Sequence, residues 1–331
     1  MRDLGDLHKK LRQRLKGPSG ASFLPEQPTA VARPSAGDEG FLAGPGTNSG
    51  AAGAPVPVDA LGESFLPPGQ APSPGESILP PLERRAETKP LRSGTLEELL
   101  PGEQVVTDQG TCWHIRQAGA ELAADSRALH EAWLTAPRGR RKLHELLAAP
   151  PGEVAFLDIE TCGLRGLPLF LVGLAWLDES DVRIDYLLAR QQAEEPAVLA
   201  LTAQLLAGAS WLVTYNGGTF DLPYLEQRRA FHRTPPFPKP AHCDLLDHAR
   251  RIVGRRYGDC RLQTLERELC GRPRPPGDVP GAQIPATYQR WVDTRDAGLL
   301  APIVTHNGHD LLTMVGLVTA LAEVRGQRDS V

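Results

Sequence analysis

The sequence has few aromatic residues, no paired-cysteine motif and no long apolar run. Aromatics make up 5% of the 331 residues, and the five cysteines are an odd number without any CxxC spacing. They therefore predict neither a disulfide framework nor a standard zinc or iron–sulfur site. No stretch has the length of a membrane span, and residues 1–16 lack the apolar centre of a signal peptide. These absences favour a cytoplasmic protein in a reducing compartment.

The sequence also lacks a strong net charge and the common nucleotide-binding and hydrolase motifs. Its formal net charge is −4, too mild for a membrane surface or a general attraction to polyanions, so any such binding must be local. The patterns GxxxxGK[ST], GxGxxG, GxSxG and HExxH do not occur. The sequence therefore predicts no nucleotide cofactor site and no membrane partner.

Proline and glycine, by contrast, are abundant near the N-terminus, where they make up 25 of the 76 residues of segment 17–92. Such a segment cannot bury enough apolar surface to offset its ordering entropy, so we expect a disordered linker. Leucines at helical spacing in residues 1–16 predict a short amphipathic helix that could dock on a protein partner. The recurring tetrapeptides SFLP (22–25 and 64–67) and SILP (77–80) are either partner motifs or chance repeats in a biased segment.

The rest of the chain predicts an α/β protein. Residues 93–150 indicate a small β-hairpin around Asp108 to Gly110 and a helical lead-in packed on the main domain. The main domain is expected at 151–325, and residues 326–331 form a tail. Apolar runs predict five further strands, at 154–158, 169–177, 182–189, 211–215 and 241–245. Helical patterns cover 195–207, 221–232, 244–254, 262–269, 285–291 and 308–324. This alternation favours a sheet covered by helices.

Two acids follow the first of these strands, in the segment FLDIETCGL. Asp158 and Glu160 are two residues apart, so on an extended strand their side chains face the same side. We expect both carboxylates at the carboxyl end of the strand, where ligands usually bind in open α/β sheets.

A third acid closes the segment YNGGTFD, between the strand at 211–215 and the next helix. Gly217 and Gly218 allow positive φ and a close backbone approach. Asp221 then either caps the helix that follows or joins the acids of the first strand.

A fourth acid lies in THNGHDLLTMVGL, on a helix whose leucines and valines indicate core packing. His306 and Asp310 are four residues apart and share a helical face. An acid at the edge of an apolar face is costly unless it is exposed, paired or metal-bound. The alternative is a solvated boundary aspartate beside a packing histidine, with His309 on another face.

Together, the segments FLDIETCGL, YNGGTFDLPYL and HNGHD resemble the three motifs of the DEDD-type 3′–5′ exonuclease group in the DnaQ-like, ribonuclease H-like superfamily. The arrangement is most similar to the YprB-like ribonuclease H-like domain family, with further support from HCDLLDHARR, LQTLEREL and DVPGAQIPATYQRW. The resemblance covers roughly residues 95–325 and implies a ribonuclease H-like mixed five-stranded sheet flanked by helices.

The resemblance also implies a two-metal-ion nuclease. Two Mg²⁺ or Mn²⁺ ions would be held by Asp158, Glu160, Asp221 and Asp310, since hard cations prefer oxygen ligands. His306 would be the base or would orient the attacking water. Here the sequence departs from the family: the position that carries tyrosine in the DEDDy subgroup, four residues before the last aspartate, is His306, and the histidine position of the DEDDh subgroup is Thr305.

Further residues are candidates for contacts with DNA or RNA. Tyr215 and Asn216 either shape a nucleic-acid cleft or hold the turn, and Asp244 is either an acid just behind the metal ligands or a helix cap. Residues 228–274 carry a surplus of seven positive charges. The candidate phosphate contacts in that region are Arg250, Arg251, Arg255 and Arg256, followed by Arg261. A solvated basic helix face is the alternative.

Three functions therefore remain open. The first is a metal-dependent nuclease, and more narrowly an exonuclease, acting on DNA or RNA. The second is a nucleic-acid-binding module of the same fold that cleaves poorly, for which the histidine at the tyrosine position leaves room. The third is a scaffold that acts through residues 1–92. Cys162, beside the acid pair, has no visible activating base and is not expected to be a nucleophile.

Overall fold

The computed structural model describes residues 93–136, 142–163, 166–272, 274–275 and 277–329, with side chains to 324. The predicted N-terminal helix, the linker and the SFLP and SILP repeats lie outside these residues. Among the described helices, none is both long and apolar enough to cross a membrane.

One mixed seven-stranded sheet organises the described residues, with the order β1-β2-β5-β4-β3-β6-β7. The strands are β1 (Glu103–Thr107), β2 (Gly110–Ala118), β3 (Val154–Thr161), β4 (Leu169–Leu177), β5 (Val182–Leu188), β6 (Trp211–Thr214) and β7 (Ala241–Asp244). In the sheet, the neighbouring strands β1, β2, β5, β4 and β3 pair antiparallel. Strands β3, β6 and β7 run parallel to one another. The α/β class is confirmed.

The five predicted strands of the main domain form β3 to β7, and the predicted hairpin adds two more to the same sheet. Strand β2 pairs with β5 in antiparallel register, with Trp113 opposite Leu188. The hairpin reverses at Gly110, whose φ of 116° is in a region that favours glycine. The lead-in is therefore continuous with the main sheet through backbone hydrogen bonds.

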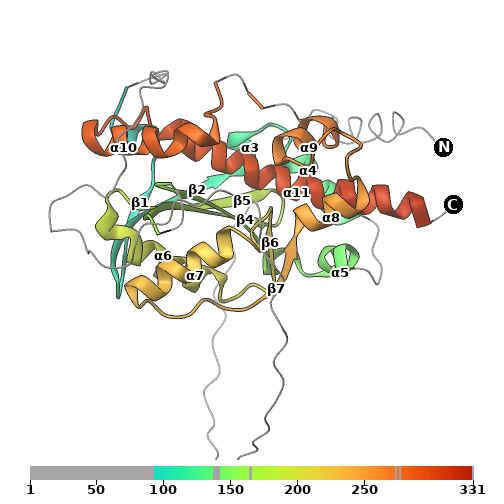
Figure 1. Cartoon of the computed structure of the whole chain (residues 1–331), viewed down its shortest axis with the longest axis horizontal. Helices are drawn as coiled ribbons and strands as arrows, with labels where there is room; N and C mark the ends of the chain where they lie inside the picture. The colour runs from blue at the N-terminus through green and yellow to red at the C-terminus, as the bar shows by residue number, and fades with distance from the viewer. Residues whose placement is uncertain (1–92, 137–141, 164–165, 273, 276, 330–331) are drawn as a thin grey trace, which may run out of the picture. The chain divides into compact units, whose positions relative to one another are not determined.

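Helices cover both faces of the sheet. They are α2 (Leu96–Leu99), α3 (Gly119–Leu122), α4 (Ser126–Thr135), α5 (Lys142–Ala148), α6 (Glu195–Leu206), α7 (Asp221–His232), α8 (Leu245–Ile252), α9 (Leu262–Glu268), α10 (Ile284–Thr294) and α11 (Ala301–Asp329), with 3₁₀ turns η1 (Pro151–Glu153), η2 (Gln192–Glu194) and η3 (Gly281–Gln283). In Figure 1, α11 crosses above the sheet, and α6 and α7 lie below it. Helix α11 contacts β3, β4, α4, α8 and α9.

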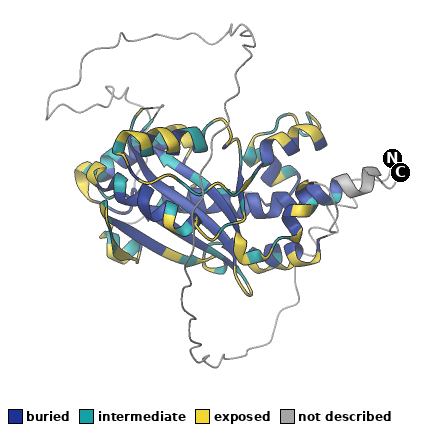
Figure 2. Ribbon diagram, turned by 90° about the horizontal axis from the view of Figure 1, so that it is seen from below, coloured by how far each residue is buried: buried dark blue, intermediate teal, exposed yellow. Residues whose placement is uncertain are grey.

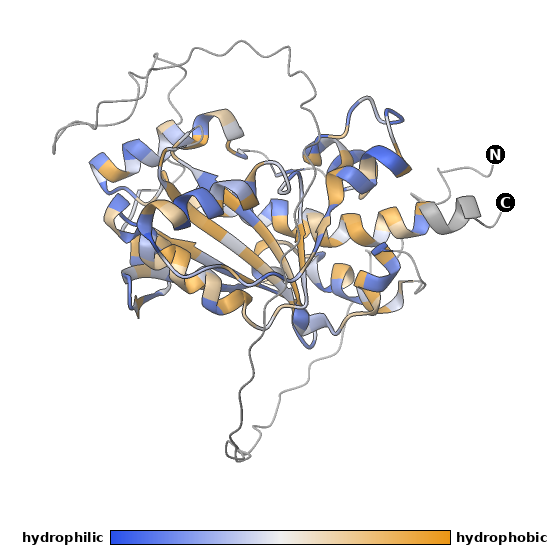
Figure 3. Cartoon of the chain, turned by 60° about the horizontal axis from the view of Figure 1, so that its bottom comes forward, coloured by the Kyte–Doolittle hydropathy of each residue, from blue (hydrophilic) through white to orange (hydrophobic). Residues whose placement is uncertain are grey.

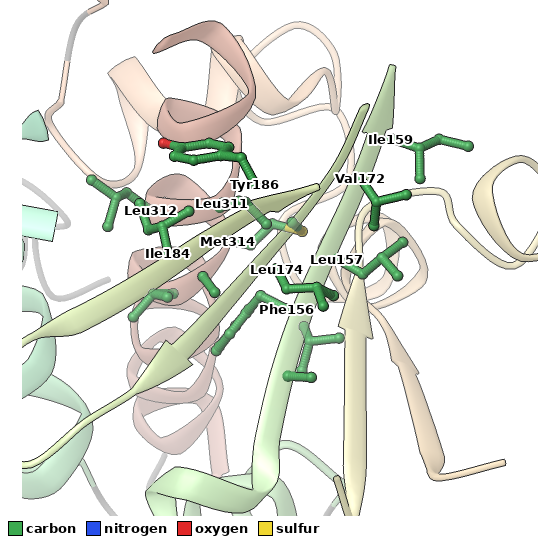
Figure 4. Close-up of a cluster of buried hydrophobic side chains, with 14 of the residues drawn as sticks. Phe156, Leu157, Ile159, Val172, Leu174, Ile184, Tyr186, Leu311, Leu312 and Met314 are labelled. Carbon is green, nitrogen blue, oxygen red and sulfur yellow. The ribbon is translucent and has the colours of Figure 1, made fainter. Parts of the chain in front are cut away.

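The core lies between the sheet and these helices. Strand β4 is buried at every position, and so is α11 from Leu311 to Ala322 (Figure 2). The central strands and α11 are accordingly largely apolar (Figure 3). Figure 4 shows Phe156, Leu174 and Met314 within this cluster. Each such side chain contributes about 1.5–3 kcal/mol when fully buried, so the sheet and α11 form a rigid support for any polar group between them.

Candidate active site

The first two acids are held by β3. The strand continues to Thr161, three residues beyond its predicted end at Asp158, so Asp158 and Glu160 both lie within it. The extra length comes from pairing with β4, in which Asp158 lies opposite Gly173 and Glu160 opposite Leu171. Both carboxyl side chains are partly buried, and their spacing directs them to the same side of the sheet.

Helix α11 approaches the acids closely. Asn307 is fully buried, and its Nδ2 donates a hydrogen bond of 2.7 Å to Asp158 Oδ2. A Cβ atom at Gly173 would overlap Asn307 Oδ1, so the helix can sit at this distance only because β4 has glycine there. The same Oδ1 is buried without a hydrogen-bond partner. The orientation of this amide is therefore set by the carboxylate of Asp158.

The YNGGTFD turn follows β6. Asn216, not either glycine, adopts positive φ, at 65°, so the expected φ role of the glycines was wrong. Their close backbone approach is present: a Cβ at Gly217 would overlap the Thr214 side chain, and one at Gly218 would lie 3.2 Å from Asp244 Oδ2. Asp244 accepts hydrogen bonds from the backbone amides of Asn216 and Gly218, each at 2.9 Å.

The same Asp244 carboxylate caps α8, accepting a 3.0 Å bond from the amide of Leu246. It thereby ties the turn after β6 to the turn after β7. Asp244 therefore caps a helix, which was one of the two roles predicted for it from the sequence. It also lies close enough to Asp221 for its charge to raise the pKa of that acid.

Asp221 is the first residue of α7, and the capping position before it is Phe220, which makes no capping hydrogen bond through its side chain. Asp221 is 4% exposed. Burial, helped by the charge of Asp244, raises the pKa of Asp221 to about 7. Hydrogen bonds from the backbone of Asp221 itself and of Ile159 act in the opposite direction. The side chain is therefore directed into the molecule toward β3.

The three acids repel one another. Burial, followed by the charges of Glu160 and Asp221, raises the pKa of Asp158 well above its ordinary value, while Arg274 and the Asn307 hydrogen bond act in the opposite direction. Burial and the charge of Asp221 raise the pKa of Glu160 to about 8, opposed by Arg274. We call Asp158, Glu160, Asp221 and Asp310 the acid cluster.

Asp310 and His306 reach the site from α11. His306 Nε2 lies 3.4 Å from Asp310 Oδ2, as their spacing of four residues predicts. His306 Nδ1 lies 2.8 Å from Asp278 Oδ1. His309 is buried in another direction, and burial followed by the charges of Arg274 and Arg272 lowers its pKa to about 4.

Arg274 links Asp310 to the rest of the acid cluster. Its Nη2 donates to Asp310 Oδ1, its Nε donates to buried Glu266 at 2.6 Å, and its Nη1 lies 3.4 Å from Asp278 Oδ2. The charge of Arg274 also acts on Asp158 and Glu160. A guanidinium thus pairs with one of the carboxylates that the family resemblance assigns to metal ions.

The chemistry of the acid cluster fits a divalent cation. Four carboxylates form an all-oxygen donor set. Burial, with neighbouring carboxylates as a second cause, raises the pKa of three of them, and a divalent cation would favour their ionised forms. Across the described ranges, no three His, Cys, Asp or Glu side chains stand in metal-ligand geometry. Two of the carboxylates are engaged within the chain, Asp158 by Asn307 and Asp310 by Arg274.

The predicted nucleic-acid residues lie outside this cluster. The Tyr215 hydroxyl donates to the backbone carbonyl of Cys260, which ties the turn after β6 to the segment before α9. The side chain of exposed Asn216 accepts from Thr219 within the turn. The four predicted arginines on α8 and the turn after it are all exposed: Arg250, Arg251, Arg255 and Arg256.

Burial raises the pKa of the Cys162 thiol to about 12, so this cysteine is not expected to act as a nucleophile.

Sequence reasoning did not select Arg274, Asp278 or Asn307. Asn307 lies inside the HNGHD segment, one residue from His306, and a buried amide there could have been inferred from the helical face it shares with the core. Asp278 opens DVPGAQIP, which was noted only as part of the resemblance. Arg274 gave no signal, because it is one of many arginines in a basic region.

Comparison with known proteins identifies the family to which this fold belongs. The model of a family described as the RNase_H superfamily matches residues 155–322, which is just over half of the chain and spans β3 to α11. The chain belongs to the RNase_H superfamily.

A curated relative and a solved structure are also similar. Uncharacterized protein YprB of Bacillus subtilis (strain 168) is 33% identical over 167 residues, which is 49% of this chain and 40% of YprB. The predicted YprB-like resemblance is confirmed, although the chain spans less than half of that relative. A family B DNA polymerase from the hyperthermophilic archaeon Pyrobaculum calidifontis matches 51% of this chain and 24% of its own, with 16% identity and a TM-score of 0.40.

Proposed function

We propose that this protein is a metal-dependent nuclease, and more narrowly an exonuclease, that hydrolyses phosphodiester bonds of DNA or RNA. The observation that supports the proposal is the raised pKa of three buried carboxyls, Asp158, Glu160 and Asp221, while Arg274, whose charge acts on Asp158 and Glu160, pairs with the fourth acid, Asp310 on α11. A purely structural role does not account for these raised pKa values, because buried carboxylates in a stable core are normally matched by cations or hydrogen bonds.

Mg²⁺ or Mn²⁺ held by Asp158, Glu160, Asp221 and Asp310 would supply Lewis-acid polarisation of the phosphate and of the attacking water. The side chains of this chain do the remaining work. His306 Nε2 takes the proton of the water as its oxygen bonds to phosphorus. The bond from phosphorus to the ester oxygen then breaks, and that oxygen leaves with a proton from solvent.

Substrate binding is assigned to the exposed arginines of α8 and the following turn, with Tyr215 and Asn216 beside them. The charge of Arg250 acts on Tyr215, so the basic segment lies near the turn that carries Asp221. Arginines contact phosphates without reading sequence, so we expect binding that weakens with salt and depends little on sequence. The DEDD resemblance favours 3′–5′ polarity.

A nucleic-acid-binding module that cleaves poorly is the second candidate. It is favoured by His306 at the tyrosine position and by the engagement of Asp310 with Arg274. In that case the arginines would bind nucleic acid and the acid cluster would turn over little substrate.

Degradation of end-labelled single- and double-stranded DNA and RNA with Mn²⁺ or Mg²⁺ tests the proposal. We expect cleavage that EDTA abolishes and that Asp158→Asn and Asp310→Asn reduce by more than about 100-fold, beyond the usual effect of losing an outer partner of a metal site. Asp293→Asn, on the exposed face of α10, is the matched control and should cleave normally. Tight binding without cleavage would favour the second candidate. Activity that disappears only on deletion of residues 1–92 would favour the scaffold.

A further inference from the structure

The His306 side chain has a partner from a distant part of the chain. Asp278 lies in the segment between α9 and η3, 28 residues before His306, and its Oδ1 is 2.8 Å from His306 Nδ1. Both side chains are largely buried, with exposed fractions of 14% and 7%. The fold therefore builds this contact from two separate segments, and water competes little for either group.

Asp278 is itself held in place. Its second oxygen, Oδ2, lies 3.4 Å from Nη1 of Arg274, and the same Nη1 lies 3.4 Å from the backbone carbonyl of His306. The Arg274 guanidinium is in turn held by Glu266 and Asp310. The carboxylate thus has one oxygen for the arginine and one for the histidine, so its position does not depend on the histidine alone.

This arrangement determines which nitrogen of the His306 ring carries a proton. An ionised carboxylate can only accept hydrogen bonds, so Nδ1 must donate to Asp278. Arg274 Nη1 is also 3.4 Å from Nδ1 and would compete as a donor, but the contact with Asp278 is shorter and charge-assisted. Nε2 lies 3.4 Å from Asp310 Oδ2, beyond the usual hydrogen-bond range, and Asp310 already accepts from Arg274, so Nε2 is not required to donate there. A neutral ring with its proton on Nδ1 therefore presents a lone pair at Nε2.

We propose that Asp278 is a positioning residue that, by accepting the Nδ1 proton, fixes the tautomer and orientation of His306 so that Nε2 faces the acid cluster as the proton acceptor. The effect of Asp278 on catalysis rests on the proposed nuclease function, whereas its effect on the tautomer of His306 does not. The carboxylate also stabilises the positive ring that forms when Nε2 takes the proton of the attacking water, as in other carboxylate–histidine pairs.

Nitrogen NMR of the full chain tests the tautomer of His306 without any substrate. The protein is labelled with ¹⁵N-histidine and kept metal-free in EDTA at about pH 9, above the ordinary pKa of histidine. Of its nine histidines, His306 is assigned by its loss in His306→Gln. We expect a protonated Nδ1 in the wild type and loss of that protonation in Asp278→Ala, where Arg274 becomes the nearest partner of Nδ1. Asp278→Glu should restore it in part, and Asp293→Ala should leave it unchanged.

An unprotonated Nδ1 in the wild type would overturn the proposal on its own, even if Asp278→Ala failed to fold. An Asp278→Ala spectrum identical to that of the wild type would also overturn it.

Kinetics then separate this inference from the proposed function. If the wild type cleaves, Asp278→Ala should lower kcat by about 10- to 100-fold with KM nearly unchanged, and Asp278→Glu should recover part of the loss. A change in KM alone would contradict the positioning role. If the wild type cleaves no substrate while Asp278→Ala still loses Nδ1 protonation, the nuclease assignment fails and the positioning of His306 stands.

Discussion

The described part of the molecule contains two buried groups of charges that are built in opposite ways. In the first, Glu195 is 1% exposed and accepts hydrogen bonds from Arg228 at 2.6 and 2.7 Å, and His232 Nε2 lies 2.7 Å away. In the second, the acid cluster, burial and neighbouring carboxylates raise the pKa of Asp158 and Glu160 against the charge of Arg274, which donates to Asp310. The first group is matched within the chain, whereas the second has more carboxyl groups than cations.

The difference shows which of the two groups serves the fold. The Glu195 pair joins the start of α6 to α7, while Glu195 also accepts from the amide of Leu169 at 2.9 Å and Arg228 donates to the carbonyl of Gly166 at 3.0 Å. Every charge there has a partner, as in a buried ion pair retained for structure. A site with more carboxyl groups than cations becomes more stable when those groups take up protons or when a metal ion supplies positive charge.

The largest expected loss of stability comes from breaking the buried pair of Glu195 and Arg228. Glu195→Gln leaves the buried guanidinium of Arg228 without its counter-ion and should lower the free energy of unfolding by about 3–5 kcal/mol. Urea unfolding followed by circular dichroism measures it. Glu226→Gln, which breaks an exposed pair with Arg229, is the control and should change stability little. Equal losses in the two variants would mean that the Glu195 pair is not a structural anchor.

The next effect is the response to metal. Mn²⁺ at about 100 times its dissociation constant should raise the free energy of unfolding of the wild type by about 2.7 kcal/mol. Asp158→Asn should abolish most of that gain and, in EDTA, should make the protein more stable than the wild type, because one of the repelling charges is gone. Thermal melts at pH 9, with and without Mn²⁺, measure both. Stabilisation of Glu195→Gln by Mn²⁺ to the same extent as the wild type would localise the metal to the acid cluster.

The dependence on pH should also separate the two groups. The pKa of Glu160 is raised from 4.5 to about 8 and that of Asp221 from 3.8 to about 7, so between about pH 5 and 8 the folded state binds more protons than the unfolded state. Stability of the metal-free protein should therefore fall as pH rises through this window. Urea unfolding in EDTA at several pH values measures the slope, which Glu160→Gln should flatten.

Asp185 provides an internal contrast for that slope. It is buried, yet hydrogen bonds from His114 and Arg183 and their charges outweigh burial and lower its pKa. For an acid with a lowered pKa, the stabilisation is present at neutral pH and is lost only as the solution becomes more acidic than the ordinary value of about 3.9. A metal-free protein whose stability rises between pH 5 and 8 would show that the repulsion in the acid cluster does not control it.

The sequence was sufficient for most of the fold because its signals are local. Helix α7 was predicted with its observed bounds, Asp221 to His232, and β4 likewise, since apolar periodicity decides these elements. The hairpin was predicted too, but its pairing with β5 was not, because strand order depends on contacts between distant segments. The acids of the site were found for the same reason as the helices: each ends or interrupts a recognisable local pattern.

The partners of those acids could not be found in this way. Arg274 and Asp278 belong to an irregular segment, and their contacts with Asp310 and His306 cross about 30 residues of chain. Asn307 was hidden because its role depends on Gly173 in another strand, which lets α11 come close enough for the 2.7 Å bond to Asp158. No periodicity encodes which side chain fills a gap between elements.

The smallest expected effect concerns Arg274, the cation that the chain itself places among the carboxylates. Two opposite consequences follow from its removal. Its charge holds down the pKa of Asp158 and Glu160, so without it both carboxyls protonate more readily and bind metal less well near neutral pH. Its contact with Asp310 also competes directly with any cation for that ligand. At about pH 9 protonation matters less, and the competition should dominate.

We therefore expect Arg274→Gln to bind Mn²⁺ about tenfold more tightly than the wild type at pH 9, which corresponds to about 1.4 kcal/mol. Two unit charges 4 Å apart interact by about 4 kcal/mol at an effective dielectric constant of 20, but the wild-type arginine keeps its bond to Glu266 when a cation displaces it from Asp310, so the net difference is smaller. Isothermal titration of the metal-free proteins measures the difference. Arg272→Gln is the control, since Arg272 also approaches Glu266 but pairs mainly with Asp125, and its Mn²⁺ affinity should equal that of the wild type. Weaker binding in Arg274→Gln at pH 9 would mean that the arginine supports the metal-bound state, and that the acid cluster is less unmatched than its repulsion indicates.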